Sequence, residues 1–326
     1  MLEEQAQGGV VERLAGAGLI EPAMANQSTI ALVTGGKAGI GYFVSERLAA
    51  AGAAVVLGSR DPAKAACAIG AIHTRVPGAR VTSVRLDLAD LASLKASVDA
   101  LDVPRLDVAV LNAGVLLEGP ARRKTPAGHE LTFGTNHLGH FALTDLLWPR
   151  LRAGRVVTTG SSPARSAHLD LDDLQGTRAF APKQAYERAK LAQMLFGFEL
   201  ARRFEEAGSG ALSVVVHPGG ALDALTPSRP PVHSRTTGQL LRAVPAGVLL
   251  QGKHADPAVR ARGARPVRRQ WTAVGLAVFG VRGKPRLETP KGPLADSATG
   301  RRLWDLSAEL TGVDPDFVTA PATGAR

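Results

Sequence analysis

The chain has 326 residues, of which 45% are apolar, and its formal net charge is +10 at pH 7. This composition indicates a globular protein long enough for one large α/β domain, and it excludes collagen-like repeats and extended disorder. Cys67 is the only cysteine, which excludes an intrachain disulfide and a cysteine-based zinc site, and we expect no resident metal.

Residues 1–28 are expected to form an N-terminal extension of unknown role. They contain one short helix-compatible stretch, Val10 to Ala17, and no run typical of a strand. The start is acidic, with Glu3 and Glu4, where a secretory signal would be basic. No run in the chain approaches the roughly 18 apolar residues of a spanning helix. We therefore expect a cytoplasmic protein without a membrane span.

From residue 29 the chain repeats short apolar runs separated by helix-length amphipathic stretches. The runs TIALV, AAVVLG, RVTSVRL, LDVAVLN, GRVVTT and ALSVVVH begin near positions 29, 53, 80, 106, 154 and 211. They are almost continuously apolar, as expected of parallel strands covered on both faces, and the last long helical stretch before residue 211 ends at Gly208. The pattern predicts a single α/β domain over 29–326, built as a Rossmann-type doubly wound parallel sheet.

The segment TGGKAGIG follows the first run directly and leads into a helix. In such a turn Gly35 permits the bend, Gly39 lets the backbone approach a pyrophosphate, and Gly41 lets the helix pack closely on the strand. The helix N-terminus offers free N–H groups to the phosphates, and Ile40 lies beside them. The alternative is a purely structural turn, but the position between strand and helix favours a dinucleotide-binding loop.

The end of the second run indicates which dinucleotide is bound. NAD sites typically place Asp or Glu there to accept the ribose hydroxyls, whereas this run ends in Gly58, Ser59 and Arg60. A guanidinium can contact a 2′-phosphate through two hydrogen bonds, and Lys37 in the glycine loop adds a second cation. We therefore expect NADP(H) as cofactor. The alternative is that Arg60 is only a solvated residue at the start of a helix.

Tyr186 and Lys190 are four positions apart in a strongly helical stretch, so both side chains project from one face. An ammonium group near a phenol favours the phenolate, which suits a tyrosine that exchanges a proton with an alcohol oxygen. Taken alone, this spacing favours two ordinary surface residues. The neighbouring motifs are needed to distinguish such a pair from a catalytic one.

Those motifs are present in a fixed order. TGGKAGIG is followed by LDLAD, LNAG, TNHLGHFALT, RVVTTGSS, YERAK and HPGG, all within residues 30–220, about two-thirds of the chain. In this set the chain resembles the short-chain dehydrogenase/reductase family, and within it the retinol-dehydrogenase-like branch. The long interval between Ser161 and Tyr186 is also similar to that branch.

The resemblance implies a catalytic role for four residues. Tyr186 would exchange the proton, and Lys190 would bind the nicotinamide ribose while favouring the phenolate. Ser161, rather than Ser162, would hydrogen-bond the substrate oxygen. Asn136 would hold a water that relays protons to Lys190.

The resemblance also implies further contacts with the cofactor. Asp87 and Leu88 would position the adenine. Asn112, Ala113 and Gly114 would support the strand against the cofactor. Pro218 and Gly219 would line the nicotinamide. Lys37 and Ala38 depart from the family, whose members usually have Asn and Ser or Thr there, and this puts the internal hydrogen bonds of the loop in doubt.

Residues 219–290 are rich in Pro, Gly and Arg, with one helix-compatible patch at 239–250, and are predicted to form a substrate loop or lid. From Ser228 to Arg326 there are 16 Lys or Arg and 7 Asp or Glu, which gives nine of the ten net positive charges. Without interleaved aromatic residues this pattern indicates a solvated basic surface or an attraction for anionic substrates or an acidic carrier, not a nucleic-acid site. The final helix, ATGRRLWDLSAELTG, is expected to stop at Gly312.

We therefore expect an NADPH-dependent oxidoreductase that transfers hydride between nicotinamide and a carbonyl or alcohol of a small-molecule substrate. Two alternatives stay open: nonredox chemistry such as cyclisation or dehydration of a metabolite, and a dinucleotide-binding sensor or scaffold without turnover. The resemblance also leaves room for a homo-oligomer paired through 129–151 and 182–205. His137 and His140 have helical spacing and are expected to be structural rather than metal ligands.

Overall fold

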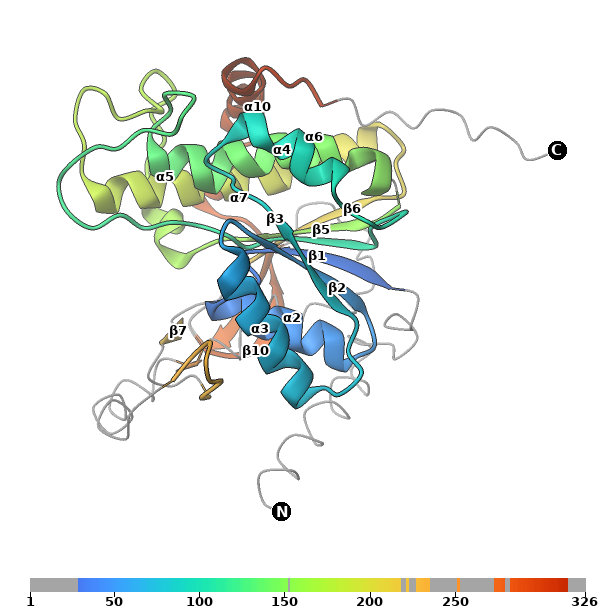
Figure 1. Ribbon diagram of the computed structural model, residues 1–326. Coiled ribbons are helices and arrows are strands. Elements are labelled where there is room, and N and C mark those ends of the chain that lie inside the picture. The colour runs from blue at the N-terminus through green and yellow to red at the C-terminus, as the bar shows by residue number, and fades with distance from the viewer. Residues whose placement is uncertain are drawn as a thin grey trace.

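The computed structural model describes residues 29–151, 153–217, 221–222, 227–234, 251–252, 273–278 and 282–315. An eight-stranded sheet runs through the middle of the molecule (Figure 1) in the order β10-β9-β6-β5-β4-β1-β2-β3. Its strands are β1 Ile30–Thr34, β2 Ala54–Ser59, β3 Val81–Arg85, β4 Val108–Leu111, β5 Arg155–Thr159, β6 Leu212–Val216, β9 Ala273–Val278 and β10 Arg282–Glu288. Neighbouring strands are parallel throughout, except that β10 pairs antiparallel with β9.

Helices cover both faces of this sheet (Figure 1). One face carries α2 Gly39–Ala50 and α3 Pro62–Arg75. The other carries α4 Leu91–Asp99, α5 Leu131–Phe133, the π-helix η2 Gly134–Leu138, α6 Gly139–Leu151 and α7 Pro182–Glu206, with α10 Ser297–Thr311 packed on α7. Two short 3₁₀ helices, η3 Ser162–Ser166 and η8 Gly292–Ala295, complete the described helices, and residues 221–222 and 251–252 form the short pair β7 and β8. No helix in these ranges combines the length and hydropathy needed to span a membrane.

The continuous apolar runs arise because each central strand packs on both sides. In β1, Leu32 belongs to the core on the α6 and α7 side, whereas Ala31 and Val33 belong to the core on the α2 and α3 side. Side chains alternate between the faces of a strand, so a strand covered on both faces has no polar position to alternate with. The six predicted strands and the doubly wound parallel order are confirmed.

The predicted helix ends are also confirmed. Gly208 follows α7 and has a positive φ of 60°, and Gly312 follows α10 with a φ of 68°, the left-handed conformation that favours glycine at a helix end. The structure differs within 219–290, where residues 273–278 and 282–288 extend the sheet as β9 and β10 rather than forming loop. The predicted helical stretches at 10–17 and 239–250 lie outside the described residues.

Residues 227–234 of the chain beyond β6 contact α2. The guanidinium of Arg229 donates to both carboxylate oxygens of Glu46, at 2.7 and 3.1 Å, and lies 5.5 Å from the ring centre of Phe43. The hydroxyl of Tyr42 donates to the same carboxylate at 2.9 Å. Burial, together with the charge of Glu46, raises the pKa of Tyr42. This part of the chain is therefore fastened to the helix that follows the glycine loop.

Gly139, at the start of α6, offers a test of the close packing between α6 and the chain after β3. A Cβ at this position would overlap the carbonyl oxygen of Leu88, so backbone would have to move. We expect Gly139→Ala to lower the free energy of unfolding by about 1–3 kcal/mol, as overpacking usually does. The measurement is urea or thermal unfolding followed by circular dichroism.

Gly70→Ala is the matched control, because Gly70 is exposed in α3 and a Cβ there would have no atom within 4 Å. It should raise the free energy of unfolding by about 0.5–1 kcal/mol, the ordinary difference in helix propensity. Equal effects of the two substitutions would contradict the packing described for α6.

Candidate functional site

A cavity of ≈ 500 Å³ opens at the carboxyl ends of β1, β2 and β4. The strand order reverses between β1 and β4, and this is where doubly wound sheets bind their ligands. The predicted cofactor contacts that line it are Gly35, Lys37, Gly39, Ile40, Arg60, Asp87, Leu88, Asn112, Ala113, Gly114 and Tyr186. Pro218 and Gly219 lie outside the described residues.

The glycine loop has the backbone shape that its sequence predicts. Gly35 and Gly39 have positive φ angles of 69° and 56°. Gly41 packs behind the loop, where a Cβ would lie 2.5 Å from the carbonyl oxygen of Gly35 and 2.6 Å from Nδ2 of Asn112. Ala38, at the N-cap of α2, provides no side-chain cap, so the first N–H groups of the helix have no such partner and can bind an anion.

Hydrogen bonds hold the opposite wall of the cavity to the end of β1. The Thr34 hydroxyl oxygen accepts from the backbone N–H groups of Asn112 and Ala113, both at 2.9 Å. The Asn112 amide donates back to the carbonyl of Thr34 at 3.1 Å. The chain leaving β4 is thereby turned away from β1 at the point where the cavity begins.

Asn136 holds the next part of the same wall. It is completely buried in the π-helix η2, and its side-chain oxygen accepts from the Val115 N–H at 2.7 Å while its Nδ2 donates to the Val115 carbonyl at 3.0 Å. This amide is therefore occupied in shaping the cavity. A water held by Asn136 would have to bind its backbone carbonyl instead.

Three cations gather where β2 ends. Arg60 and Lys37 line the cavity, and Lys64 in the first turn of α3 is close enough to Lys37 to act on its charge. Burial, with the charges of Lys64 and Arg60, lowers the pKa of Lys37. Sequence reasoning missed Lys64, because its approach depends on how α3 leaves the strand.

The carboxylate closest in sequence to this cluster, Asp61, is directed to α3. Its side chain accepts from the backbone N–H of Lys64 at 3.0 Å, which caps the helix. That hydrogen bond is the main cause of the lowered pKa of Asp61. The carboxylate therefore serves the helix start and also lies 3.8 Å from the Lys64 ammonium, while Lys37 and Arg60 line the cavity.

Tyr186 and Lys190 lie one turn apart in α7, with Tyr186 at the cavity. The Lys190 ammonium is buried and donates to the carbonyl of Thr159 in β5 at 3.1 Å and to Oε1 of Gln193 at 2.8 Å. Ser161 follows β5 directly and is the N-cap of η3, which packs on α7. Strand β5 thus connects the lysine to the predicted substrate-binding serine.

His137 and His140 are both buried, and each forms a hydrogen bond within the fold. Nε2 of His137 is 2.8 Å from the Ser307 hydroxyl of α10, and Nε2 of His140 is 2.9 Å from that of Thr34. Burial lowers the pKa of His137 to about 3 and that of His140 to about 4, so both rings are neutral near pH 7. The described part of the chain contains no cluster of three potential metal ligands.

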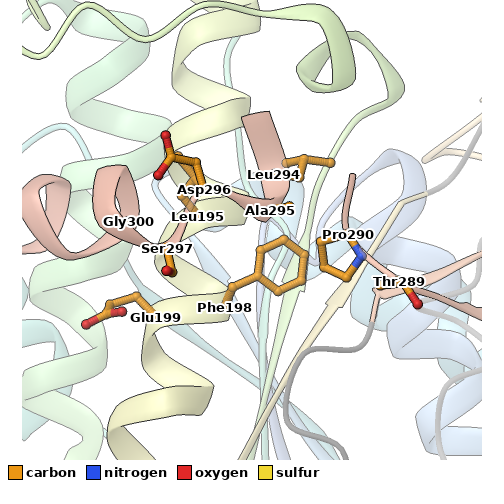
Figure 2. Close-up of a pocket in the computed structure, with 10 residues that line it drawn as sticks. All are labelled: Leu195, Phe198, Glu199, Thr289, Pro290, Leu294, Ala295, Asp296, Ser297 and Gly300. Atoms are coloured by element: carbon orange, nitrogen blue, oxygen red, sulfur yellow. The ribbon is translucent and has the colours of Figure 1, made fainter. Parts of the chain in front are cut away.

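A second cavity of ≈ 250 Å³ lies between α7 and residues 289–300 (Figure 2), and none of the predicted site residues lines it. Its two carboxylates already have partners. Glu199 pairs with Arg202 and Arg203, and Asp296 caps α10 by accepting from Thr299. The chemistry predicted from the sequence therefore belongs to the larger cavity.

Comparison with known proteins agrees with this assignment. Residues 29–170 match the family model of the short chain dehydrogenases. Human retinol dehydrogenase 13 is 32% identical over 297 residues, which cover 88% of this chain and 86% of that protein. Human polyprenol dehydrogenase is 35% identical over 212 residues, 62% of this chain, so that the match spans only 64% of that protein's length.

Solved structures show the same relationship. A protein from Mycobacterium paratuberculosis has 30% identity and a TM-score of 0.70, with 89% of this chain and 95% of that chain covered. The RhlG/NADP complex of Pseudomonas aeruginosa has 26% identity and a TM-score of 0.55, with 75% and 93% covered. The chain therefore belongs to the short-chain dehydrogenase/reductase family of NAD(P)-dependent oxidoreductases.

Proposed function

We propose that the protein is an NADPH-dependent oxidoreductase that transfers hydride between nicotinamide and a carbonyl or alcohol of a small-molecule substrate. The observation that carries the proposal is the placement of Tyr186 at the main cavity, one helical turn before a lysine whose ammonium is fixed to β5. Nonredox chemistry and a sensor without turnover are less well supported, because neither requires a phenol at this cavity one helical turn before a buried ammonium.

The residues of the cavity fit a dinucleotide phosphate. The uncapped N-terminus of α2 suits the pyrophosphate, and Asp87 and Leu88 lie where the adenine would be held. Arg60, Lys37 and Lys64 would contact the 2′-phosphate, which favours NADPH over NADH. When bound, this cofactor supplies or accepts the hydride.

The chain itself handles the proton. In the reductive direction Tyr186 would donate a proton to the oxygen that gains charge as the carbonyl is reduced, and Ser161 would hold that oxygen by a hydrogen bond. The Lys190 ammonium would favour the resulting phenolate and bind the ribose hydroxyls. Asn136 would contribute a water contact through its carbonyl.

We further propose an apolar substrate of the isoprenoid aldehyde or alcohol class. The relatives named above are dehydrogenases of retinol and polyprenol. Leu116, which follows the cavity-lining Val115, is 60% exposed, and within the described ranges it is the only large hydrophobic side chain that exposed. An apolar chain bound beside it would cover this surface.

Removal of the Arg60 charge tests the cofactor preference. We expect Arg60→Ala to weaken NADPH binding about 10- to 100-fold, as expected for the loss of charged hydrogen bonds to a phosphate, and to leave NADH binding nearly unchanged. The dissociation constants can be measured by fluorescence titration. Lys95→Ala, which removes an exposed cation paired with Asp99 on α4, is the control and should change neither constant. An equal loss for both dinucleotides would refute the phosphate contact.

The two tyrosines of the chain provide a matched test of catalysis. Tyr186→Phe should lower kcat by about 10²- to 10⁴-fold, the usual contribution of a general acid, while NADPH still binds. Tyr42→Phe removes a hydroxyl that bonds Glu46 away from the cavity and should retain kcat. The assay is the change in NADPH absorbance with all-trans-retinal and other isoprenoid aldehydes. Product formed without any change in NADPH would favour nonredox chemistry, and full activity of Tyr186→Phe would reject the proposed mechanism.

A further inference from the structure

Lys190 is held by a side chain that no motif of the sequence singled out. Gln193, three positions later in α7, is completely buried, and its Oε1 accepts from the Lys190 ammonium at 2.8 Å. An ammonium group only donates hydrogen bonds, so the amide oxygen of Gln193 must be the atom that faces it. The amide nitrogen then faces the opposite way, with its Nε2 3.4 Å from the Leu111 carbonyl of β4.

The neighbouring histidine keeps this arrangement free of a second positive charge. His140 Nδ1 is 2.9 Å from the carbonyl of Asn136, which can only accept, so Nδ1 carries the proton. The Thr34 hydroxyl accepts two backbone N–H groups and has one proton, which it shares between Nε2 of His140 at 2.9 Å and the carbonyl of Val110 at 3.2 Å. His140 is therefore satisfied as a neutral ring, and burial keeps its pKa low.

Gln193 consequently links the lysine to the neighbouring strand. Through its oxygen it bonds the ammonium of Lys190, and through its nitrogen it approaches the carbonyl of Leu111 in β4. The same nitrogen lies 3.2 Å from Nδ1 of His140, a contact of two donors and not a hydrogen bond. A neutral amide can fix the position of the ammonium without cancelling its charge, whereas a carboxylate would offset that charge. Gln193 therefore does not offset the positive charge that a phenol and ribose hydroxyls would use.

We propose that Gln193 is a positioning residue of the reaction, which fixes the position of the Lys190 ammonium relative to Tyr186 and to a bound ribose. The proposal rests on the proposed function, since it gives Gln193 an effect only through Lys190. It extends the set of residues that the reaction needs to a fully buried amide in the sheet-facing part of α7.

A double-substitution cycle tests the proposal. Gln193→Met, Lys190→Met and the double variant are titrated with NADPH, or with NADH should the wild type prefer it, by fluorescence. Gln193→Met should weaken binding about tenfold, the loss expected when a hydrogen bond no longer places a charged group. In the double variant this loss should vanish, because a residue that acts through the lysine has no effect without it. Full additivity, or wild-type affinity of Gln193→Met, would overturn the proposal.

Two further variants separate positioning from general stability. Ser213→Ala removes a 2.7 Å hydrogen bond from β6 to the carbonyl of Gly197 in α7 and should lower Tm without changing cofactor affinity. Gln193→Glu keeps the acceptor for Lys190 and should restore affinity to within about threefold of the wild type, as conservative replacement of one acceptor allows. A Gln193→Glu variant as weak as Gln193→Met would show that only packing matters.

The pH dependence of kcat is a measurement that a purely structural role of Gln193 would not change. In the described residues, the titratable groups in contact with Gln193 are Lys190 of α7 and His140 of α6. In the alcohol-oxidising direction, Gln193→Glu should shift the midpoint of kcat to higher pH, because the added carboxylate offsets the ammonium that favours the phenolate. If Lys190→Met retained cofactor binding and turnover, the proposed function itself would fail. If Lys190→Met lost them while the substitutions of Gln193 changed neither, only the role of Gln193 would be rejected.

Discussion

The hydroxyl of Thr34 is the contact on which the whole cleft depends. It lies at the carboxyl end of β1, accepts the first two N–H groups of the chain leaving β4, and is bonded to the neutral ring of His140 in α6. Each of these groups is buried or half-buried, so an unpartnered one would be costly, and a complete network gives a single arrangement. The cavity exists because β1 and β4 separate at this point toward helices on opposite faces.

The polar groups behind the cleft are neutral, and those at its surface are charged. His137 and His140 are uncharged in the core, and the amides of Asn136 and Gln193 bond there without adding charge. The buried ammonium of Lys190 donates to a backbone carbonyl and to a neutral amide, while Lys37 and Arg60 line the cavity at the end of β2. An anionic ligand in the cavity would meet these two cations.

Much of this could be predicted from the sequence, because parallel strands and a glycine turn leave strong local signals. The strands that contain Leu32, Val110 and Val157 place apolar side chains on both faces of the sheet, and Gly35 and Gly41 have no room for a side chain. β9 and β10 escaped prediction because Arg, Pro and Gly surround their runs and their pairing is set by tertiary contact with β6. Lys64 escaped it because α3 brings it to Lys37, a contact that spacing along the chain does not reveal. Gln193 escaped it because it belongs to no motif, although it meets Lys190 on its own helix. The bonds between the side chain of Asn136 and the backbone of Val115 also have no signal in the sequence.

The ion pair between Arg229 and Glu46 has a consequence for how this protein can diversify. The two charges lie in a largely buried position, and the hydroxyl of Tyr42 shares the same carboxylate. Loss of either charge would leave the other without its partner, which is strongly unfavourable in such surroundings. Related proteins should therefore keep both Arg229 and Glu46 or replace both together.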